Sequence, residues 1–156
     1  MSRPPPKHPS DWKLCRDAEH GFALWYPPDW KRAGPPGRCV GLQRGEPNLP
    51  EGPPEVDVFI RVVSLQGRFP TDYLPPETPP GHEFDVGRGV SYTDRAELVV
   101  GGLEAVRARF RSSGPTPNWG VEYAIRKGDR ILDAYISQPR PEIEEEFDRV
   151  IATLEW

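Results

Sequence analysis

Residues 97–111 read ELVVGGLEAVRARFR, and this stretch decides the fold class that the sequence predicts. Two runs with strand-like alternation, Glu97–Val100 and Leu103–Arg111, flank the pair Gly101–Gly102. Glycine readily takes the positive φ angles that a two-residue turn between antiparallel strands requires. We therefore predict a β-hairpin here, and with it a sheet whose neighbouring strands run antiparallel.

Further strands are predicted on either side of this hairpin. Val121–Arg126 and Ile131–Ser137 flank a Lys-Gly-Asp-Arg turn and form a second hairpin. Residues 56–63 carry apolar side chains on both faces, which is typical of a central strand covered on two sides. Weaker strand signals lie at residues 12–15, 22–26 and 39–43, whereas residues 29–31 are predicted to begin a helical turn.

The C-terminal segment has the periodicity of a helix. Its apolar residues fall on one face at helical spacing: Ile143, Phe147, Val150, Ile151 and Leu154. Pro141 suits the first helical position, and the acidic residues that follow suit the positive end of the helix dipole. With six or seven strands and this helix, we predict an α+β fold, a central antiparallel sheet with the C-terminal helix packed on it.

The chain has 156 residues, which is the size of one domain. We expect a flexible Pro-rich arm over residues 1–11 and a single domain over residues 12–156. Pro-rich stretches at residues 33–55 and 64–95 interrupt the strand pattern, and residues 69–74 are predicted to form a helical turn. Because loops of this length are uncommon in compact domains, they are candidates for a binding site.

Charge and composition narrow the class of protein. The formal net charge is −4, which argues against a nucleic-acid binder because such proteins usually carry a basic excess. No run of 18 apolar residues predicts a membrane span, and no signal peptide is visible, so we expect a cytoplasmic location. Arginine far outnumbers lysine and proline reaches 21 residues, which favours a thermophilic, GC-rich bacterial source.

The two cysteines, Cys15 and Cys39, are too few for a disulfide framework and do not form a CxxC motif. The simpler interpretation is two free, partly buried thiols. The alternative is one disulfide that closes the loop between them, which is expected only in an oxidising compartment or in a hyperthermophile.

No motif predicts catalysis, a metal or a cofactor. The three histidines, His8, His20 and His82, lack the spacing of zinc ligands. Ser91 follows Gly89 but lacks the second glycine of a nucleophile elbow. We therefore predict no catalytic residue, no metal site and no cofactor.

Arginine occupies three alternate positions of the predicted strand 103–111, and on a strand these side chains share one face: Arg107, Arg109 and Arg111. The other face carries Val106, Ala108 and Phe110. Such an arginine stripe could bind carboxylates or phosphates of a partner. In the simpler interpretation the stripe is a solvated sheet face, paired with Glu97, Glu104 or Glu122 on neighbouring strands. The acidic run at residues 142–148 is explained by the helix dipole and a solvated helix face.

Trp119 is the second candidate for contact with a partner. It lies at a loop tip or strand start, and an exposed tryptophan there would be typical of a binding hot spot. Packing in the core is the alternative, and we assign Trp25 and Trp30 to the core.

Three stretches together resemble the PsbP-like superfamily. Residues 21–30, GFALWYPPDW, resemble its opening pattern GF-x-hydrophobic-x-YP-x-x-W. Residues 147–154 are similar to its terminal helix, and residues 101–105 are similar to its glycine hairpin. The resemblance covers the chain from residue 12 to the end. The chain departs from many bacterial members in lacking an export or lipoprotein signal and in having proline loops where they have a helix.

The resemblance implies a fold with a central antiparallel sheet and helices on both sides. The superfamily includes an extrinsic photosystem II subunit, a nuclear Ran-binding release factor and many uncharacterised bacterial proteins, and its shared role is accessory or binding. We therefore expect a non-catalytic module that binds a protein partner not named by the sequence. Two alternatives remain open: a small enzyme with a pocket in the proline loops, and a self-associating protein with Trp156 and a sheet edge in a homodimer interface.

Overall fold

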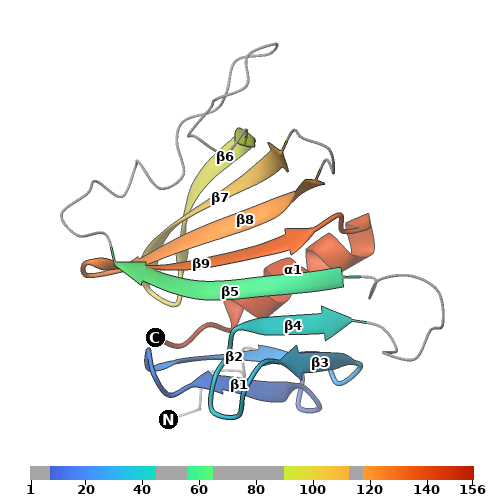
Figure 1. Cartoon of the computed structure of the whole chain (residues 1–156), viewed down its shortest axis with the longest axis vertical. Coiled ribbons are helices and arrows are strands. Elements are labelled where there is room, and N and C mark those ends of the chain that lie inside the picture. Colours follow the sequence, from blue (N-terminus) through green and yellow to red (C-terminus); the bar gives the residue numbers. More distant parts are fainter. Residues whose placement is uncertain (1–7, 45–55, 65–89, 113–117) are drawn as a thin grey trace, which may run out of the picture.

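The computed structural model describes residues 8–44, 56–64, 90–112 and 118–156 (Figure 1). In this part of the chain the elements are, in order, β1 (Lys13–Asp17), β2 (Phe22–Tyr26), β3 (Trp30–Ala33), β4 (Gly41–Arg44), β5 (Val56–Ser64), β6 (Val90–Val100), β7 (Leu103–Ser112), β8 (Asn118–Lys127), β9 (Arg130–Ser137) and α1 (Pro141–Ala152).

Seven of these strands form one sheet in the order β3-β4-β5-β9-β8-β7-β6, and every neighbouring pair is antiparallel. β1 and β2 form a separate two-stranded sheet near β3. The predicted α+β class, the antiparallel sheet and both predicted hairpins are confirmed. β6 begins at Val90, well before the predicted Glu97, because a bulge between Thr93 and Ala96 breaks the alternation that a sequence pattern detects.

Two local predictions are wrong. Residues 29–31 do not begin a helical turn, because Trp30 is the first residue of β3. The side chain of Trp30 is fully buried, and this burial overrides the turn-forming propensity of the neighbouring residues. The strand predicted at residues 39–43 begins only at Gly41. The predicted helical turn at residues 69–74, His82 and the proline loops at residues 45–55 and 65–89 lie outside the described residues.

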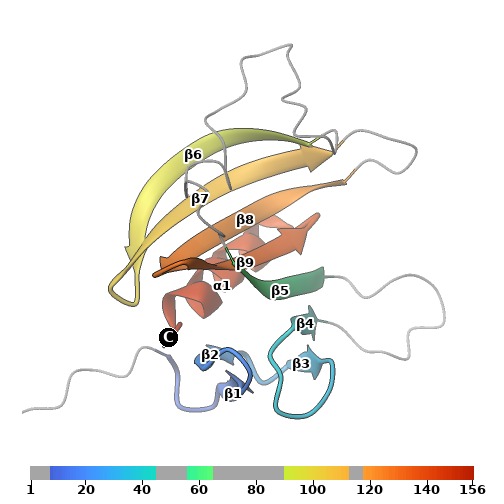
Figure 2. The same ribbon diagram turned by 60° about the vertical axis from the view of Figure 1, so that its left-hand side comes forward.

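α1 packs against one face of the curved sheet, and the main apolar core lies between them (Figure 2). The apolar face of α1 is buried through Ile143, Phe147, Val150 and Ile151. Complete burial of each such side chain contributes roughly 1.5–3 kcal/mol. The opposite sheet face carries a smaller cluster around Tyr92 and Phe110.

The middle strand of the seven is β9, and β5, which was predicted as a central strand covered on two sides, lies inside the sheet as its neighbour. β5 buries Val58 and Ile60 on the side of α1, but Phe59 on the other side is 44% exposed. By contrast β9 is buried at four consecutive positions from Ile131 to Ala134, which is typical of a strand covered on both faces.

The C-terminal residues attach the β1–β2 sheet to the rest of the fold. The Thr153 hydroxyl accepts a hydrogen bond from the Trp25 amide at 2.8 Å and donates to the Val150 carbonyl at 2.6 Å. Glu155 then exchanges two backbone hydrogen bonds of 2.8 Å with Ala23. The end of α1 is therefore held to β2 by its own backbone as well as by apolar packing.

Cys15 and Cys39 form a disulfide with a Cα–Cα distance of 5.5 Å, so the prediction of two free thiols is wrong. Spacing could not reveal this bond, because long-range contacts of the Asp17 side chain bring residue 39 beside β1.

Removing the disulfide tests how much it contributes to the free energy of unfolding. We expect Cys15→Ala/Cys39→Ala to lower the free energy of unfolding by about 3 kcal/mol, because the bond restricts the unfolded chain. Urea unfolding of the variant, beside the wild type with and without a thiol reductant, measures this loss. Equal stability of all three samples would show that the bond contributes nothing.

Candidate functional site

The structure places the arginine stripe of β7 on the sheet face that α1 covers. Arg107 and Arg109 both contact acidic side chains of α1, whereas Ala108 and Phe110 are buried on the opposite face. The predicted alternation of the two faces is therefore present. What differs along the stripe is the environment of each arginine.

Arg107 is enclosed between the sheet and α1. Its Nη2 donates to Glu144 Oε1 at 2.9 Å and to Asp148 Oδ2 at 3.2 Å, and its Nε donates to Asp148 Oδ1 at 3.0 Å. The guanidinium also lies 5.8 Å from the centre of the Tyr123 ring. Burial alone would lower the pKa of Arg107, but the bonds and charges of Asp148 and Glu144 outweigh it and raise the pKa, so Arg107 stays charged.

Arg109 shares Glu144 with Arg107. Its two terminal nitrogens donate to both carboxylate oxygens of Glu144, a bidentate geometry, and its Nε lies 3.5 Å from Asp94 Oδ2. Burial raises the pKa of Glu144, but the two arginines outweigh this effect and the net pKa is lowered. Tyr123 donates its hydroxyl to Asp148 Oδ1.

These contacts correct two predictions. The acidic residues of α1 do more than face solvent, because Glu144 and Asp148 neutralise the stripe. The acidic partners predicted for the stripe are paired elsewhere: Glu97 with Arg95, Glu104 with Arg126 and Glu122 with Tyr92. The prediction missed that α1 would cover this face and supply the carboxylates.

Arg111 and Trp119 form the exposed end of the stripe. They are register partners on β7 and β8, and Trp119 is 44% exposed, which rules out the alternative that it packs in the core. Within the described residues Arg111 has no ion pair, in contrast to Arg107 and Arg109. We call Arg111 and Trp119 the β7–β8 patch.

The backbone fixes the position of this patch. The Trp119 carbonyl accepts a hydrogen bond of 2.7 Å from the Gln138 amide, and the Trp119 amide donates to Asn118 Oδ1 at 3.0 Å. A Cβ at the next residue, Gly120, would lie 1.9 Å from the Ile136 carbonyl oxygen, so only glycine fits there. Trp119 is thus held at the surface on a rigid strand end.

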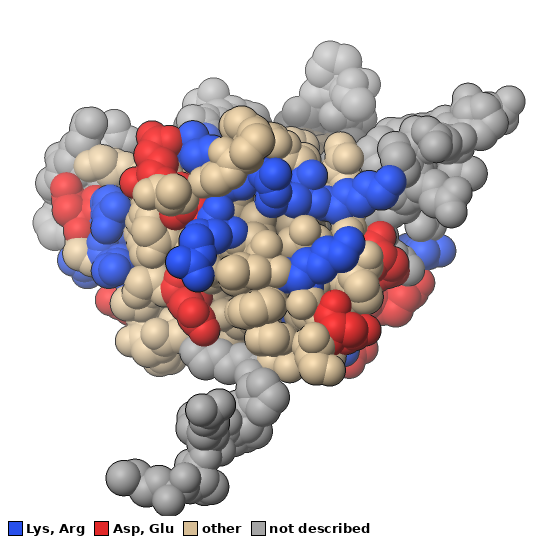
Figure 3. All heavy atoms as spheres, turned by 90° about the horizontal axis from the view of Figure 1, so that it is seen from below, with Lys and Arg blue, Asp and Glu red and all other residues tan. Residues whose placement is uncertain are grey.

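A second group of cations lies on the side formed by β1 and β3, where Figure 3 shows Lys and Arg side chains extending across the surface. Some of these are used within the fold: Arg32 donates to three carbonyls and Arg38 pairs with Asp17 and Glu19. Trp25 on this side is covered by the stacked ring of His8, 3.9 Å away. Among the described residues, Trp25 is thus less accessible to a partner than Trp119 of the β7–β8 patch, which is 44% exposed.

The opposite face of the sheet holds a buried pair of acids that the sequence analysis missed. Glu122 and Asp133 are 8% and 1% exposed. Tyr92 donates its hydroxyl to Glu122 Oε1 at 3.2 Å, and Arg61 Nε donates to Asp133 Oδ2 at 2.8 Å. An aspartate inside the apolar run of β9, ILDAYI, was the available signal.

Burial, and after it the hydrogen bond and charge of Asp133, raise the pKa of Glu122 well above its usual range. Two neighbouring buried carboxylates with one arginine cannot both carry a charge without large cost, so the pair holds a proton at neutral pH. The proton spares the sheet a second buried negative charge.

Comparison with known proteins identifies the fold. No family model matches the chain. The solution structure of the cyanobacterial PsbP from Synechocystis sp. PCC 6803 is similar with a TM-score of 0.56 and 13% identity, over 95% of this chain and 94% of that one. The chain adopts the PsbP-like fold. The resemblance seen in the sequence is thereby confirmed for the architecture.

Two further structures share the PsbP-like fold. The Ran-binding protein Mog1p of Saccharomyces cerevisiae has a TM-score of 0.56 and 8% identity, over 92% of this chain and 94% of that one. A protein from Bacteroides thetaiotaomicron VPI-5482 has a TM-score of 0.56 and 12% identity, over 93% of this chain but 48% of that one. In the described part of the chain no helix is long and apolar enough to cross a membrane.

The buried acid pair predicts a pH dependence of stability. The unfolded chain releases the Glu122 proton near pH 4.5, whereas the folded chain keeps it to a higher pH. Stability therefore falls as pH rises above 4.5, by at most about 1.4 kcal/mol for each pH unit. We expect Glu122→Gln, which resembles the protonated acid, to flatten this fall between pH 5 and 9 in urea unfolding.

Glu104→Gln is the matched control, because Glu104 is a largely exposed glutamate on the neighbouring strand β7. It should leave the pH profile of the wild type unchanged. A Glu122→Gln profile with the same slope as the wild type would mean that Glu122 is ionised in the folded protein.

Proposed function

We propose that the chain is a non-catalytic protein-binding module in which the β7–β8 patch docks on an acidic surface of a partner. The observation that carries this proposal is the exposed Trp119 beside Arg111, an arginine without an ion pair in the described part of the chain. Tryptophan and arginine are the side chains most enriched in binding hot spots. A rigid strand end presents them with little loss of conformational freedom.

The four residues predicted from the sequence have unequal parts in this proposal. Arg111 and Trp119 contact the partner. Arg109 lies at the border of the patch, where its partly exposed side chain adds positive potential although Glu144 binds it. Arg107 serves the fold, since Glu144 and Asp148 occupy its donors.

The similar structures support a binding role without naming the partner. One of them is described as a Ran-binding protein, which is a property of that protein. At these identities the likeness extends only to the fold, so the location of the docking surface rests on Arg111 and Trp119 themselves.

One observation favours the alternative of a small enzyme. Glu122, Asp133 and Tyr135 lie together, and burial raises the pKa of both Glu122 and Tyr135. A catalytic acid must reach its substrate, however, and the two carboxyl groups are almost completely buried. The binding module therefore remains our proposal.

Self-association through Trp156 is also less favoured. The Trp156 indole donates to the His20 carbonyl at 3.0 Å, meets Phe22 edge-on and lies under Lys127 and Arg130. These contacts use the tryptophan within its own chain, so a homodimer would need another surface.

The disulfide favours a different location from the predicted cytoplasm. Disulfides persist in oxidising compartments and are rare in the cytosol of mesophiles. We propose that the protein works in an oxidising compartment, or in the cytoplasm of a hyperthermophile, where such bonds also persist.

Capture experiments with matched variants test the docking surface. Immobilised wild-type protein and Arg111→Glu/Trp119→Ala are each exposed to an extract of the source cells. We expect a bound protein to be retained by the wild type, and to be lost from the double variant because it has a reversed charge and no indole.

Arg126→Glu is the control, since it reverses a similarly exposed arginine on β8 away from the patch. It should retain the same protein. The docking surface is refuted if the double variant, folded by circular dichroism, captures the same proteins in the same amounts as the wild type.

A further inference from the structure

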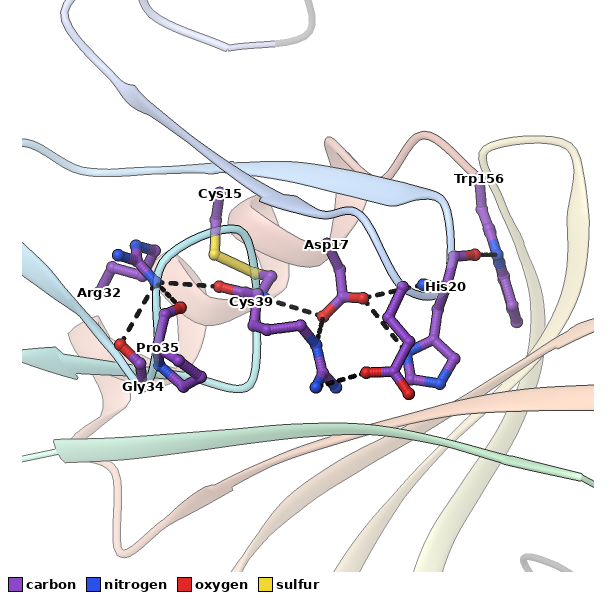
Figure 4. Close-up of polar contacts among 10 residues, drawn as sticks. Cys15, Asp17, His20, Arg32, Gly34, Pro35, Cys39 and Trp156 are labelled. Atoms are coloured by element: carbon purple, nitrogen blue, oxygen red, sulfur yellow. Dashed lines mark hydrogen bonds and ion pairs between the residues drawn. A yellow bond between two sulfur atoms is a disulfide. The ribbon is translucent and has the colours of Figure 1, made fainter.

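The Asp17 carboxylate joins the two segments that the disulfide also joins (Figure 4). Its Oδ2 accepts hydrogen bonds from the Cys39 amide at 2.9 Å and from Arg38 Nε at 3.0 Å. Its Oδ1 accepts from the His20 amide at 2.9 Å and lies 3.2 Å from His20 Nδ1. Asp17 itself is only 1% exposed.

Asp17 lies two residues after Cys15 on β1, and both side chains point into the core. Its bond to the Cys39 amide therefore holds the backbone of the second cysteine beside the first. This contact does not involve either sulfur atom, so it can form in the reduced protein as well.

Other contacts hold the segment of Cys39 in the same place. The Ala18 amide donates to the Gly37 carbonyl at 2.9 Å, and the Ile60 amide donates to the Val40 carbonyl at 3.0 Å. Arg32 Nη1 donates to the carbonyls of Pro35 and Arg38, at 2.7 and 3.0 Å. The segment is thus anchored on both sides of Cys39 without the disulfide.

The Asp17 carboxylate is suited to this task because it stays charged. Burial alone would raise its pKa, but the amides of Cys39 and His20 and the side chain of Arg38 outweigh burial, and the net pKa is lowered. Hydrogen bonds to a charged acceptor are stronger than those to a neutral one.

We propose that Asp17 sets the redox stability of the Cys15–Cys39 disulfide, by holding the two thiols of the reduced protein within bonding distance. Disulfide formation and the Asp17 contacts are then coupled, and each favours the other by the same factor.

The equilibrium that measures this coupling is exchange with glutathione. Two glutathione thiols are oxidised to glutathione disulfide, while the protein disulfide gains two electrons and two protons and opens to two thiols. The equilibrium constant of this exchange reports the effective concentration of one cysteine thiol near the other in the reduced protein.

The test compares this equilibrium in the wild type, Asp17→Asn and Arg38→Met. Each protein is equilibrated with glutathione buffers of increasing reducing strength, quenched with acid, and its thiols are alkylated and counted by mass. We expect the constant for disulfide formation to fall by at least about tenfold in Asp17→Asn, which loses the charge and one acceptor oxygen. Arg38→Met removes one of the bonds from a partly exposed side chain and should lower the constant by about threefold or more.

Ile131→Val is the control for a general loss of stability, because it trims a buried side chain of the separate apolar cluster, which does not include the cysteines. It should lower the urea midpoint and leave the exchange constant at the wild-type value. If Asp17→Asn does not fold, the exchange constant of Arg38→Met alone tests the proposal.

The proposal is overturned if the folded Asp17 and Arg38 variants keep the wild-type exchange constant, or if Ile131→Val lowers it as much. It is also overturned if the reduced wild type is unfolded by circular dichroism, since Asp17 could not then position the thiols.

Discussion

The guanidinium of Arg107, which is only partly exposed between the sheet and α1, is the constraint on which the arrangement of sheet and helix depends. A charge in this position is tolerated only when its donors are satisfied, and α1 satisfies them with Glu144 and Asp148. These two acids are four residues apart, so they lie on one face of the helix, one turn from each other. The helix can supply both carboxylates in only one rotation about its axis and one position along β7.

This constraint also divides the arginine stripe. The helix covers Arg107, reaches Arg109 with Glu144, and leaves Arg111 beyond its acidic residues. The same β7 alternation therefore gives one arginine to the fold and one to the surface. Trp119 enters the surface group because β8 pairs it with Arg111, while Gly120 allows the close backbone approach behind it.

Features that follow from the spacing of apolar and turn residues along the chain could be predicted from the sequence. Features that depend on contacts between distant residues could not. The hairpin at Gly101–Gly102 and the helix at Pro141 follow from neighbouring residues alone. The core position of Trp30 was predicted, but residues 29–31 were given a helical turn because strand β3 exists only through pairing with β4. The disulfide was missed because Asp17 brings Cys39 to β1.

The candidate site shows the same limit. Alternation placed the three arginines on one face, but their acidic partners were sought on neighbouring strands because the position of α1 was not known. The pair of Glu122 and Asp133 was missed for a related reason, since only the order of the strands brings these two acids together under Tyr92 and Arg61.

The most direct test of this account replaces Arg107 and Arg111 separately and compares their contributions to stability. Arg107→Met and Arg111→Met remove the same charge from the same strand, and urea unfolding compares their stabilities with the wild type. The account predicts a loss of at least about 1.5 kcal/mol for Arg107→Met, because it removes the charged hydrogen bonds to the partly buried carboxylates of Glu144 and Asp148. It predicts a change within about 0.5 kcal/mol for Arg111→Met. Equal losses in the two variants, or a larger loss at Arg111, would contradict it.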